Sequence, residues 1–583
     1  MPTLEWIGKD KVINHHLDVP YRVLERKYSY DEGGQHEEDN GSENMIIHGD
    51  NLDALKSLLP QYEGRVKCIY IDPPYNTGNE GWVYNDNVND PRIKKWLGEV
   101  VGKEGEDLSR HDKWLCMMYP RLKLLQRLLS DEGVIFISID DTEYANLKLI
   151  SNEIFGANCF VSNISWQRTY STRNDSKGIV NEVEHILCYS KQPDWQPNKL
   201  PRTEEMDSKY KNPDNDVMPW TSSDAFAPGA ATHQGMVYAI QHPFNGKLIY
   251  PYTGSCWRYQ QDSMLEIMSG WTAYELRDLE DAERRAEVCG ISTDAVRPSV
   301  KAIMLATPIA EAKKDAQAVL ERGQWPRFYF TSNGKGGIRR KTYLDNVEGK
   351  PPTNYWPYDE TGHTDEAKKE LISIFGGNSP FNTPKPSRLL EFVLRIAADS
   401  NAIVLDSFAG SGTTAHAVLK MNKDDGGHRK FILVEMMDYA DSITAERVKR
   451  VVQGFGAGKQ AVEGTGGSFS YYELGEPLMI GDNLNEAVGV DKIREYVFFT
   501  ETKCRLPEAH MDEPYYLGEH ANNAYYFYYE RDAITTLNRD FLRTVKTKAD
   551  GYVIYADLCT LSEEERERHH ITFKKIPRDI TKL

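Results

Sequence analysis

Short apolar runs alternate with stretches of helical periodicity in two separate parts of this chain. In the first part the runs cover residues 44–50, 66–71 and 134–139. In the second part they cover residues 403–405 and 431–434, again separated by helical patterns. Runs of this length and β-branched content predict buried strands. The alternation of strand and helix predicts an α/β fold with a mainly parallel, doubly wound sheet.

Other details of the pattern set limits on single elements. A helix is expected over residues 114–129, where Pro120 should kink it or begin a new segment, and Gly133 should follow its end. A further pair of strands is expected at 159–166 and 185–189.

The stretch between the two parts has weaker periodicity and more aromatic, proline and polar residues, with one helix expected over 299–322. At 583 residues the chain exceeds what one core accommodates. The expected segments are an N-terminal arm with an acidic linker (1–43), the first half of the sheet domain (44–190), an inserted recognition domain (191–377), the second half of the sheet domain (378–453) and a C-terminal α+β domain (454–583).

The run at 66–71 ends abruptly in Asp72-Pro73-Pro74-Tyr75. Prolines cannot donate to a sheet ladder, so Asp72 and Tyr75 should lie on a stiff turn at the carboxyl end of the strand, where ligands bind in open α/β sheets. A carboxylate and a fixed Pro73 carbonyl would suit an exocyclic amine, and Tyr75 offers a ring for stacking, as for a base taken out of its stack. A solvated aspartate on a Pro-Pro turn is the alternative.

A second turn, Asp406 to Gly412, leads from a strand into a helix that Thr413 opens. Its small residues permit a close approach of the backbone to a ligand. The turn lacks the lysine of a Walker A loop and differs from the dinucleotide-binding pattern, so alone it indicates only a nucleotide-like ligand. Glu435 follows the next strand, a position that often receives ribose hydroxyls. Asp50 could accept from a nucleotide or cap a helix.

The chain has 70 basic and 88 acidic residues, a formal charge of −18, so any contact with nucleic acid must come from local patches. One candidate is the stretch 334–346 with Arg339, Arg340 and Lys341, which could track phosphates or form an ordinary basic hairpin. The eight cysteines show no metal-binding spacing, and no metal is expected. Their scattered positions predict reduced thiols in a cytoplasmic protein. The sequence shows no charged-then-apolar signal segment and no run of 18 apolar residues, so neither secretion nor a membrane span is expected.

The motifs DPPYNTG, FNTPKP and DSFAGSGTT, in this order, resemble those of the β class of DNA adenine-N6 methyltransferases. The wording of GDNLDAL, WLCMMYPRLKL and GVIFISIDD is most similar to the Mod subunit of Type III restriction-modification systems. The likeness covers about residues 44–190 and 362–450. It implies a circularly permuted Rossmann-like sheet that uses S-adenosylmethionine, with a target-recognition insert. It also implies methylation of double-stranded DNA by base flipping.

The resemblance assigns roles to the motif residues. Asp72, Pro73, Pro74 and Tyr75 would hold the flipped adenine, and Asp72 would stabilise the positive charge that develops on its amine. The cofactor would lie against the second turn, with Asp406 beneath it, its ribose on Glu435 and its adenine on Asp50. The residues expected to bind the cofactor are Asp50, Asn382, Thr383, Pro384, Lys385, Pro386, Asp406, Phe408, Ala409, Gly410, Gly412, Thr413 and Glu435.

The same resemblance implies a homodimer and a separate, Res-like helicase-nuclease subunit in a bacterium or archaeon. Two alternatives stay open. The pocket could methylate N4 of cytosine, although enzymes of that kind more often carry serine in place of Asp72. The chain could also serve as a DNA-recognition subunit for a partner nuclease, with methylation secondary.

Overall fold

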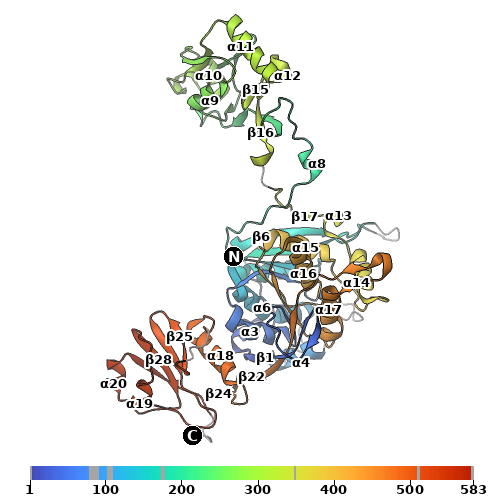
Figure 1. The fold of residues 1–583 in the computed structure, drawn as a ribbon, viewed down its shortest axis with the longest axis vertical. Helices are drawn as coiled ribbons and strands as arrows, with labels where there is room; N and C mark the ends of the chain where they lie inside the picture. The colour runs from blue at the N-terminus through green and yellow to red at the C-terminus, as the bar shows by residue number, and fades with distance from the viewer. Residues whose placement is uncertain are drawn as a thin grey trace. The chain divides into compact units, whose positions relative to one another are not determined.

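The computed structural model describes residues 3–77, 91–101, 109–171, 178–346, 349–507 and 512–578. It contains two compact units, one made of Met1–Asn198 with Pro352–Leu583 and the other of Lys199–Pro351 (Figure 1). The sequence predicted an insert over the wider range 191–377. Residues 355–375 lie in the first unit instead, because Tyr355 and Trp356 pair with a strand of its sheet.

An eleven-stranded sheet forms the centre of the first unit. Its middle is parallel, in the order β5 (Leu129–Ile139), β4 (Val66–Ile71), β18 (Ile403–Asp406), β19 (Lys430–Glu435) and β3 (Met45–His48). The apolar residues of these strands are almost entirely buried, as expected for strands covered on both faces. The predicted doubly wound sheet is confirmed.

The two halves of this sheet come from chain segments more than 300 residues apart. They meet where β4 lies beside β18, with Cys68 opposite Val404 and Ile69 opposite Leu405. From this line β4 continues to β5 on one side and β18 to β19 on the other. The junction is therefore the topological switch point, where the carboxyl ends of parallel strands form a ligand site.

The edges of the sheet extend beyond the predicted limits. On one side it continues through β7 (Val183–Ser190), β6 (Phe160–Gln167) and β17 (Tyr355–Trp356), and the first two confirm the expected strand pair. On the other side it continues through β22 (Phe469–Pro477), β1 (Arg22–Asp31) and β2 (Gly34–His36). Parts of the predicted arm, acidic linker and C-terminal segment thus belong to the central sheet. Their long-range pairing leaves no local signal in the sequence.

Helices that face the sheet supply the rest of the core. α6 is one helix that contains Pro120, so the second expected outcome, that the proline begins a new segment, is wrong. Burial of Met118, Tyr119 and Leu122 around the proline offsets the cost of the missing hydrogen bond, about 3 kcal/mol. The main helices are α3 (Asn51–Tyr62), α4 (Pro91–Val100), α6 (Arg110–Leu128), α7 (Tyr144–Phe155), α14 (Thr364–Phe375), α15 (Ser387–Ala397), α16 (Thr413–Asp425) and α17 (Glu446–Gln453).

The second unit has its own core of aromatic and aliphatic residues. A three-stranded sheet orders β15 (Phe328–Phe330), β16 (Ile338–Tyr343) and β8 (Trp220–Asp224). A four-stranded sheet orders β11 (Leu248–Ile249), β10 (Ile240–Gln241), β14 (Ala302–Leu305) and β13 (Tyr274–Arg277). The helix predicted over 299–322 is only α11 (Ile309–Arg322), because residues 302–305 pair in β14 and Pro308 caps the helix.

The C-terminal part of the first unit carries a second, smaller sheet of α+β type. Its order is β25 (Tyr516–His520), β26 (Asn523–Phe527), β28 (Gly551–Ala556) and β30 (Ile571–Lys575), with α18 (Val490–Thr502) and α20 (Glu563–Arg568). Ser562 and Glu565 form a capping box at the start of α20. Across the described ranges of the chain, no helix is long and apolar enough to span a membrane.

Candidate active site

The turn after β4 is held from both sides. The indole Nε1 of Trp114 donates to the carbonyl of Pro74 at 2.6 Å. Asn76 has a φ of +59°, which is uncommon outside glycine, and its side-chain amide donates to the Arg110 carbonyl at 3.2 Å and to the carboxylate of Glu143. These bonds fix the backbone that carries Asp72 and Tyr75, so the turn is a rigid platform.

Lys385 lies against this platform, not against the second turn, through its side chain. Its ammonium group is 2.9 Å from both oxygens of Asp72 and 2.9 Å from the hydroxyl of Tyr75. The Tyr75 hydroxyl in turn donates to Asp72 at 2.8 Å. All three side chains are buried, and Lys385 Nζ is 5.1 Å from the centre of the Tyr75 ring. An amine donor of this chain thus occupies acceptors of the kind predicted to hold a target amine.

Glu184, at the start of β7, completes the cluster. Its Oε2 is 3.5 Å from Lys385 Nζ, and its Oε1 accepts from Arg168 at 2.7 Å. Burial would raise the pKa of Glu184, but Lys385 and Arg168 outweigh it and lower that pKa. Burial would likewise lower the pKa of Lys385, while Asp72 and Glu184 raise it above its usual value. No motif in the sequence pointed to Glu184 or Arg168. The amino end of an antiparallel strand next to β5 lies at the same sheet edge as Asp72, and this was the available signal.

The second turn wraps an acid of its own. Oδ1 of Asp406 accepts from the backbone N–H of Phe408 at 3.0 Å, and Oδ2 accepts from the hydroxyl of Thr414 at 2.6 Å. Asp406 is buried, and burial raises its pKa to about 7. Gly412 has a φ of +78°, and a Cβ there would meet the carbonyl of Thr444 at 3.0 Å. The turn therefore needs glycine and offers a buried carboxyl group.

Two further contacts tie the second turn to its surroundings. Asn51 donates from its side chain to the Ser407 carbonyl at 3.1 Å. Thr413 donates to the Lys385 carbonyl at 3.3 Å. Residues 382–386 therefore lie between the DPPY turn, which the Lys385 side chain reaches, and the second turn, which its backbone reaches. The permuted sheet implied by the resemblance thus brings both turns together on neighbouring strands.

The two remaining acids predicted to hold the cofactor have protein partners. Glu435 accepts from the backbone N–H of Gly410 at 2.8 Å and of Met437 at 3.0 Å, so it supports the turn directly. Asp50 is the N-cap of α3 and accepts from Leu52 N–H at 2.8 Å, which is the capping alternative expected from the sequence. A carboxylate accepts up to about four hydrogen bonds, so neither contact prevents binding of a ligand.

A buried ion pair that no sequence motif indicated supports the start of α16. Arg447 donates to Ser411 at 3.0 Å and to Thr413 at 2.7 Å, and it pairs with Glu370 at 3.1 Å. The side chain of Arg447 is fully buried. It holds the hydroxyl groups beside Gly412 in place.

In the second unit the three basic residues singled out from the sequence have different environments. Lys341 is fully buried between Asp214 and Asp216, where it serves the core. Arg339 pairs with Asp224 at 2.8 Å. Arg340 is half-buried and donates to Ser223 at 3.4 Å.

Arg340 belongs to a group of three arginines around Tyr259. Burial and the nearby charges of Arg258 and Arg327 lower the pKa of Arg340. The Arg327 guanidinium is 5.8 Å from the Tyr259 ring centre, and Arg258 and Arg327 are exposed. None of the three arginines forms an ion pair with a carboxylate within the parts of the chain that the structure describes. We call this group the arginine patch.

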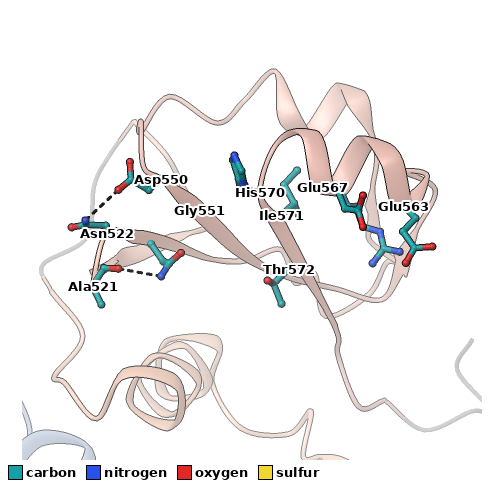
Figure 2. Close-up of a pocket in the computed structure, with 11 residues that line it drawn as sticks. Ala521, Asn522, Asp550, Gly551, Glu563, Glu567, His570, Ile571 and Thr572 are labelled. Carbon is teal, nitrogen blue, oxygen red and sulfur yellow. Dashed lines mark hydrogen bonds between the residues drawn. The ribbon is translucent and has the colours of Figure 1, made fainter.

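A further hollow of about 800 Å³ lies in the C-terminal sheet, and its lining includes no residue of either turn (Figure 2). It lies at the amino ends of β26, β28 and β30, and Asn522 donates to Asp550 across one side at 3.2 Å. Its lining mixes both charges, with Asp550, Glu563 and Glu567 beside Arg566 and His570.

A permuted α/β sheet that brings an acid-proline turn and a glycine turn side by side has the arrangement that the resemblance to methyltransferases implies. The family model described as "DNA methylase" matches residues 66–273 and 292–496, which together are more than half of the sequence. The chain belongs to this DNA methylase family.

Two curated relatives are Mod subunits of Type III restriction-modification enzymes. The StyLTI Mod subunit of Salmonella typhimurium is 33% identical over 476 residues, which cover 76% of this chain and 61% of that protein. The EcoP15I Mod subunit of Escherichia coli is 29% identical over 464 residues, covering 74% and 64%. This chain therefore spans less than two thirds of the length of these relatives.

Proposed function

We propose that this chain is a site-specific DNA methyltransferase that transfers a methyl group from S-adenosylmethionine to N6 of adenine in double-stranded DNA. The observation that carries the proposal is that β4 and β18 are neighbouring parallel strands. Asp72 directly follows β4, and Asp406 is the last residue of β18. A target pocket and a cofactor pocket must share one sheet edge for methyl transfer, and these two turns do so. Similarity to Mod subunits supports the same function.

The residues at the first turn suit a poor amine nucleophile. The lone pair of the adenine amine is conjugated with the ring, and acceptors at Asp72 and the Pro73 carbonyl would draw its hydrogens out of the ring plane. Asp72 would also stabilise the positive charge that develops on the nitrogen. Trp114 and Asn76 hold these acceptors in place, so little reorganisation is needed. Extrusion of the base costs a few kcal/mol, and stacking on Tyr75 would return about 1–3 kcal/mol.

The second turn fits the cofactor that the proposal requires. When bound, S-adenosylmethionine supplies an electrophilic methyl group on a cationic sulfur. A buried carboxyl group whose pKa is about 7 suits a cationic ligand, and Asp406 provides one. Gly410 and Gly412, both at positive φ, keep the turn open to a close ligand. Glu435 and Asp50 would bind ribose and adenine, and Asn382 to Pro386 would line the other side.

The decisive experiment measures modified bases. DNA from a host that expresses only this chain should contain N6-methyladenine, detected by mass spectrometry of nucleosides and mapped by methylation-sensitive long-read sequencing. Asp72→Ala should abolish the mark, and Asp141→Ala, an exposed aspartate beyond β5, should not. N4-methylcytosine in its place would favour the cytosine alternative. No modified base would leave only the role of a DNA-recognition subunit.

The arginine patch is the proposed DNA contact of the second unit, and it replaces Lys341 in that role. Three guanidinium groups without carboxylate partners, next to an aromatic ring, suit phosphates or guanine edges. Alanine at Arg258, Arg327 or Arg340 should weaken DNA binding and reduce the slope of log K against log salt by about 1 for each phosphate that the variant no longer neutralises. The matched control is Arg339→Ala, since Arg339 already pairs with Asp224.

A homodimer and a Res-like helicase-nuclease partner are further parts of the proposal. The relatives are named as subunits of Type III restriction-modification enzymes, which supports a partner chain. The homodimer rests on the resemblance in sequence alone. Light scattering on the purified chain would measure its mass. Cleavage of DNA only after a partner chain is added would support a Type III-like system. A purified chain that binds its site and directs cleavage without ever methylating would favour the recognition-subunit alternative.

A further inference from the structure

We propose that Lys385 is a positioning residue that holds the place of the target amine on Asp72 and yields it by moving to Glu184. The inference rests on the proposed methyl transfer for its kinetic test. The Lys385 ammonium satisfies Asp72 at 2.9 Å on each oxygen and Tyr75 at 2.9 Å. It therefore uses the acceptors that an exocyclic amine would need, and it lies over the ring on which a base would stack.

A second partner for the ammonium group is already within reach. Glu184 Oε2 is 3.5 Å from Lys385 Nζ, while its other oxygen stays with Arg168 at 2.7 Å. A small shift of the flexible lysine side chain exchanges one carboxylate for another without leaving a buried cation unpaired. Arg lacks this freedom, and a neutral residue could not supply the charge.

The charges of the cluster explain why a lysine is needed. Two acids, Asp72 and Glu184, face two bases, Lys385 and Arg168, and the Tyr75 hydroxyl lies within 2.8 and 3.3 Å of the two acids. Asp406 and Tyr70 are the other titratable groups near Asp72. Without Lys385, Glu184 keeps Arg168, and Asp72 loses the ammonium group that lies on both of its oxygens. One of the two buried carboxyl groups should then bind a proton more tightly than before. A protonated Asp72 is a poor acceptor for the target amine.

The first test compares pH profiles of methylation. Lys385→Met should lower kcat at pH 7 about tenfold or more. The rise of kcat with pH should also shift to higher pH, by about one pH unit or more. The double variant Lys385→Met with Glu184→Gln leaves one acid, Asp72, and one base, Arg168, in the cluster. The pH at which its kcat rises should therefore return toward that of the unaltered chain. Glu184→Gln alone should lower kcat without shifting the pH at which it rises. Glu182→Gln, just before β7, is the control.

The second test needs no activity and therefore separates this inference from the proposed function. At pH 5 the thermal midpoint of the full chain should differ little between Lys385→Met and the unaltered chain. As pH rises to 8, the midpoint of the variant should fall increasingly below that of the unaltered chain. The reason is that a raised carboxyl pKa in the folded variant makes its stability fall as pH rises. The double variant should lose this pH dependence. A deficit equal at every pH, or a double variant that behaves like Lys385→Met, would overturn the inference.

Discussion

Asp406→Asn should stabilise this protein most above neutral pH and progressively less as pH falls toward 5. Asn has almost the same shape as Asp, and both hydrogen bonds can persist. The side-chain oxygen can still accept from Phe408 N–H, and the amide can donate to Thr414, whose hydroxyl then reverses its role. The substitution thus removes the titrating carboxyl group of residue 406 and changes little else.

The size of the effect follows from the pKa. Burial raises the pKa of Asp406 from 3.8 to about 7. The folded chain therefore binds the proton more tightly than the unfolded chain, and this stabilisation is complete below pH 3.8 and is lost as pH rises through about 7. At about 1.4 kcal/mol per pH unit, the total loss is on the order of 4 kcal/mol. Asn has no proton to lose, so the variant should gain up to that amount at pH 8.

The assay is a set of thermal or urea midpoints between pH 5 and pH 8.5, expressed as the difference between variant and unaltered chain. Taking the difference cancels the titration of all other groups. Asp424→Asn, an exposed position of α16, is the control and should give a flat difference. A flat difference for Asp406→Asn as well would show that Asp406 is ionised at every pH in this range, and the reasoning from burial would be refuted.

The same contacts predict four more outcomes. Binding of S-adenosylmethionine, measured by calorimetry, should weaken as pH falls below about 7, by at most tenfold per pH unit, and Asp406→Asn should remove this dependence. Asp72→Ala should abolish methylation while a calorimetric titration shows unchanged cofactor affinity. Tyr75→Ala should weaken the binding of target DNA and slow turnover, which gel-shift and single-turnover assays would resolve. Arg447→Met should leave the half-buried Glu370 without its arginine and Ser411 and Thr413 without a donor, at a cost of about 1–3 kcal/mol of stability, seen as a lower thermal midpoint.

The sequence predicted the sheet domain well because its information is local. Apolar runs such as 66–71 and 431–434 form buried strands, and the stiff turn after Ile71 lies where the strand ends. The predictions that were wrong concern competition between local and distant forces. Pro120 does not break α6 because the surrounding side chains are buried, and residues 302–305 leave a helical pattern because they pair with other strands.

The same contrast between local and distant information applies to the candidate site. Both turns could be placed from their motifs, but the side chain of Lys385 could not. Its motif associates it with the cofactor, whereas its ammonium group lies on Asp72, 313 residues away in sequence. Glu184 and Arg447 carry no motif at all, and only packing shows what they contact. Sequence therefore identifies backbone turns more readily than the charges that surround them.

The insertion of a whole unit between two halves of one sheet is compatible with an intact site because the two turns meet at the β4–β18 junction. Lys199–Pro351 leaves and re-enters the first unit beyond β7 and before β17, at the sheet edge, so its insertion breaks no central strand pair. Two side-chain contacts, Asn51 to Ser407 and Lys385 to Asp72, join the halves and belong to the first unit alone. The inserted unit can therefore vary in sequence, and with it the DNA site that it would recognise, while the geometry around Asp72 and Asp406 stays the same.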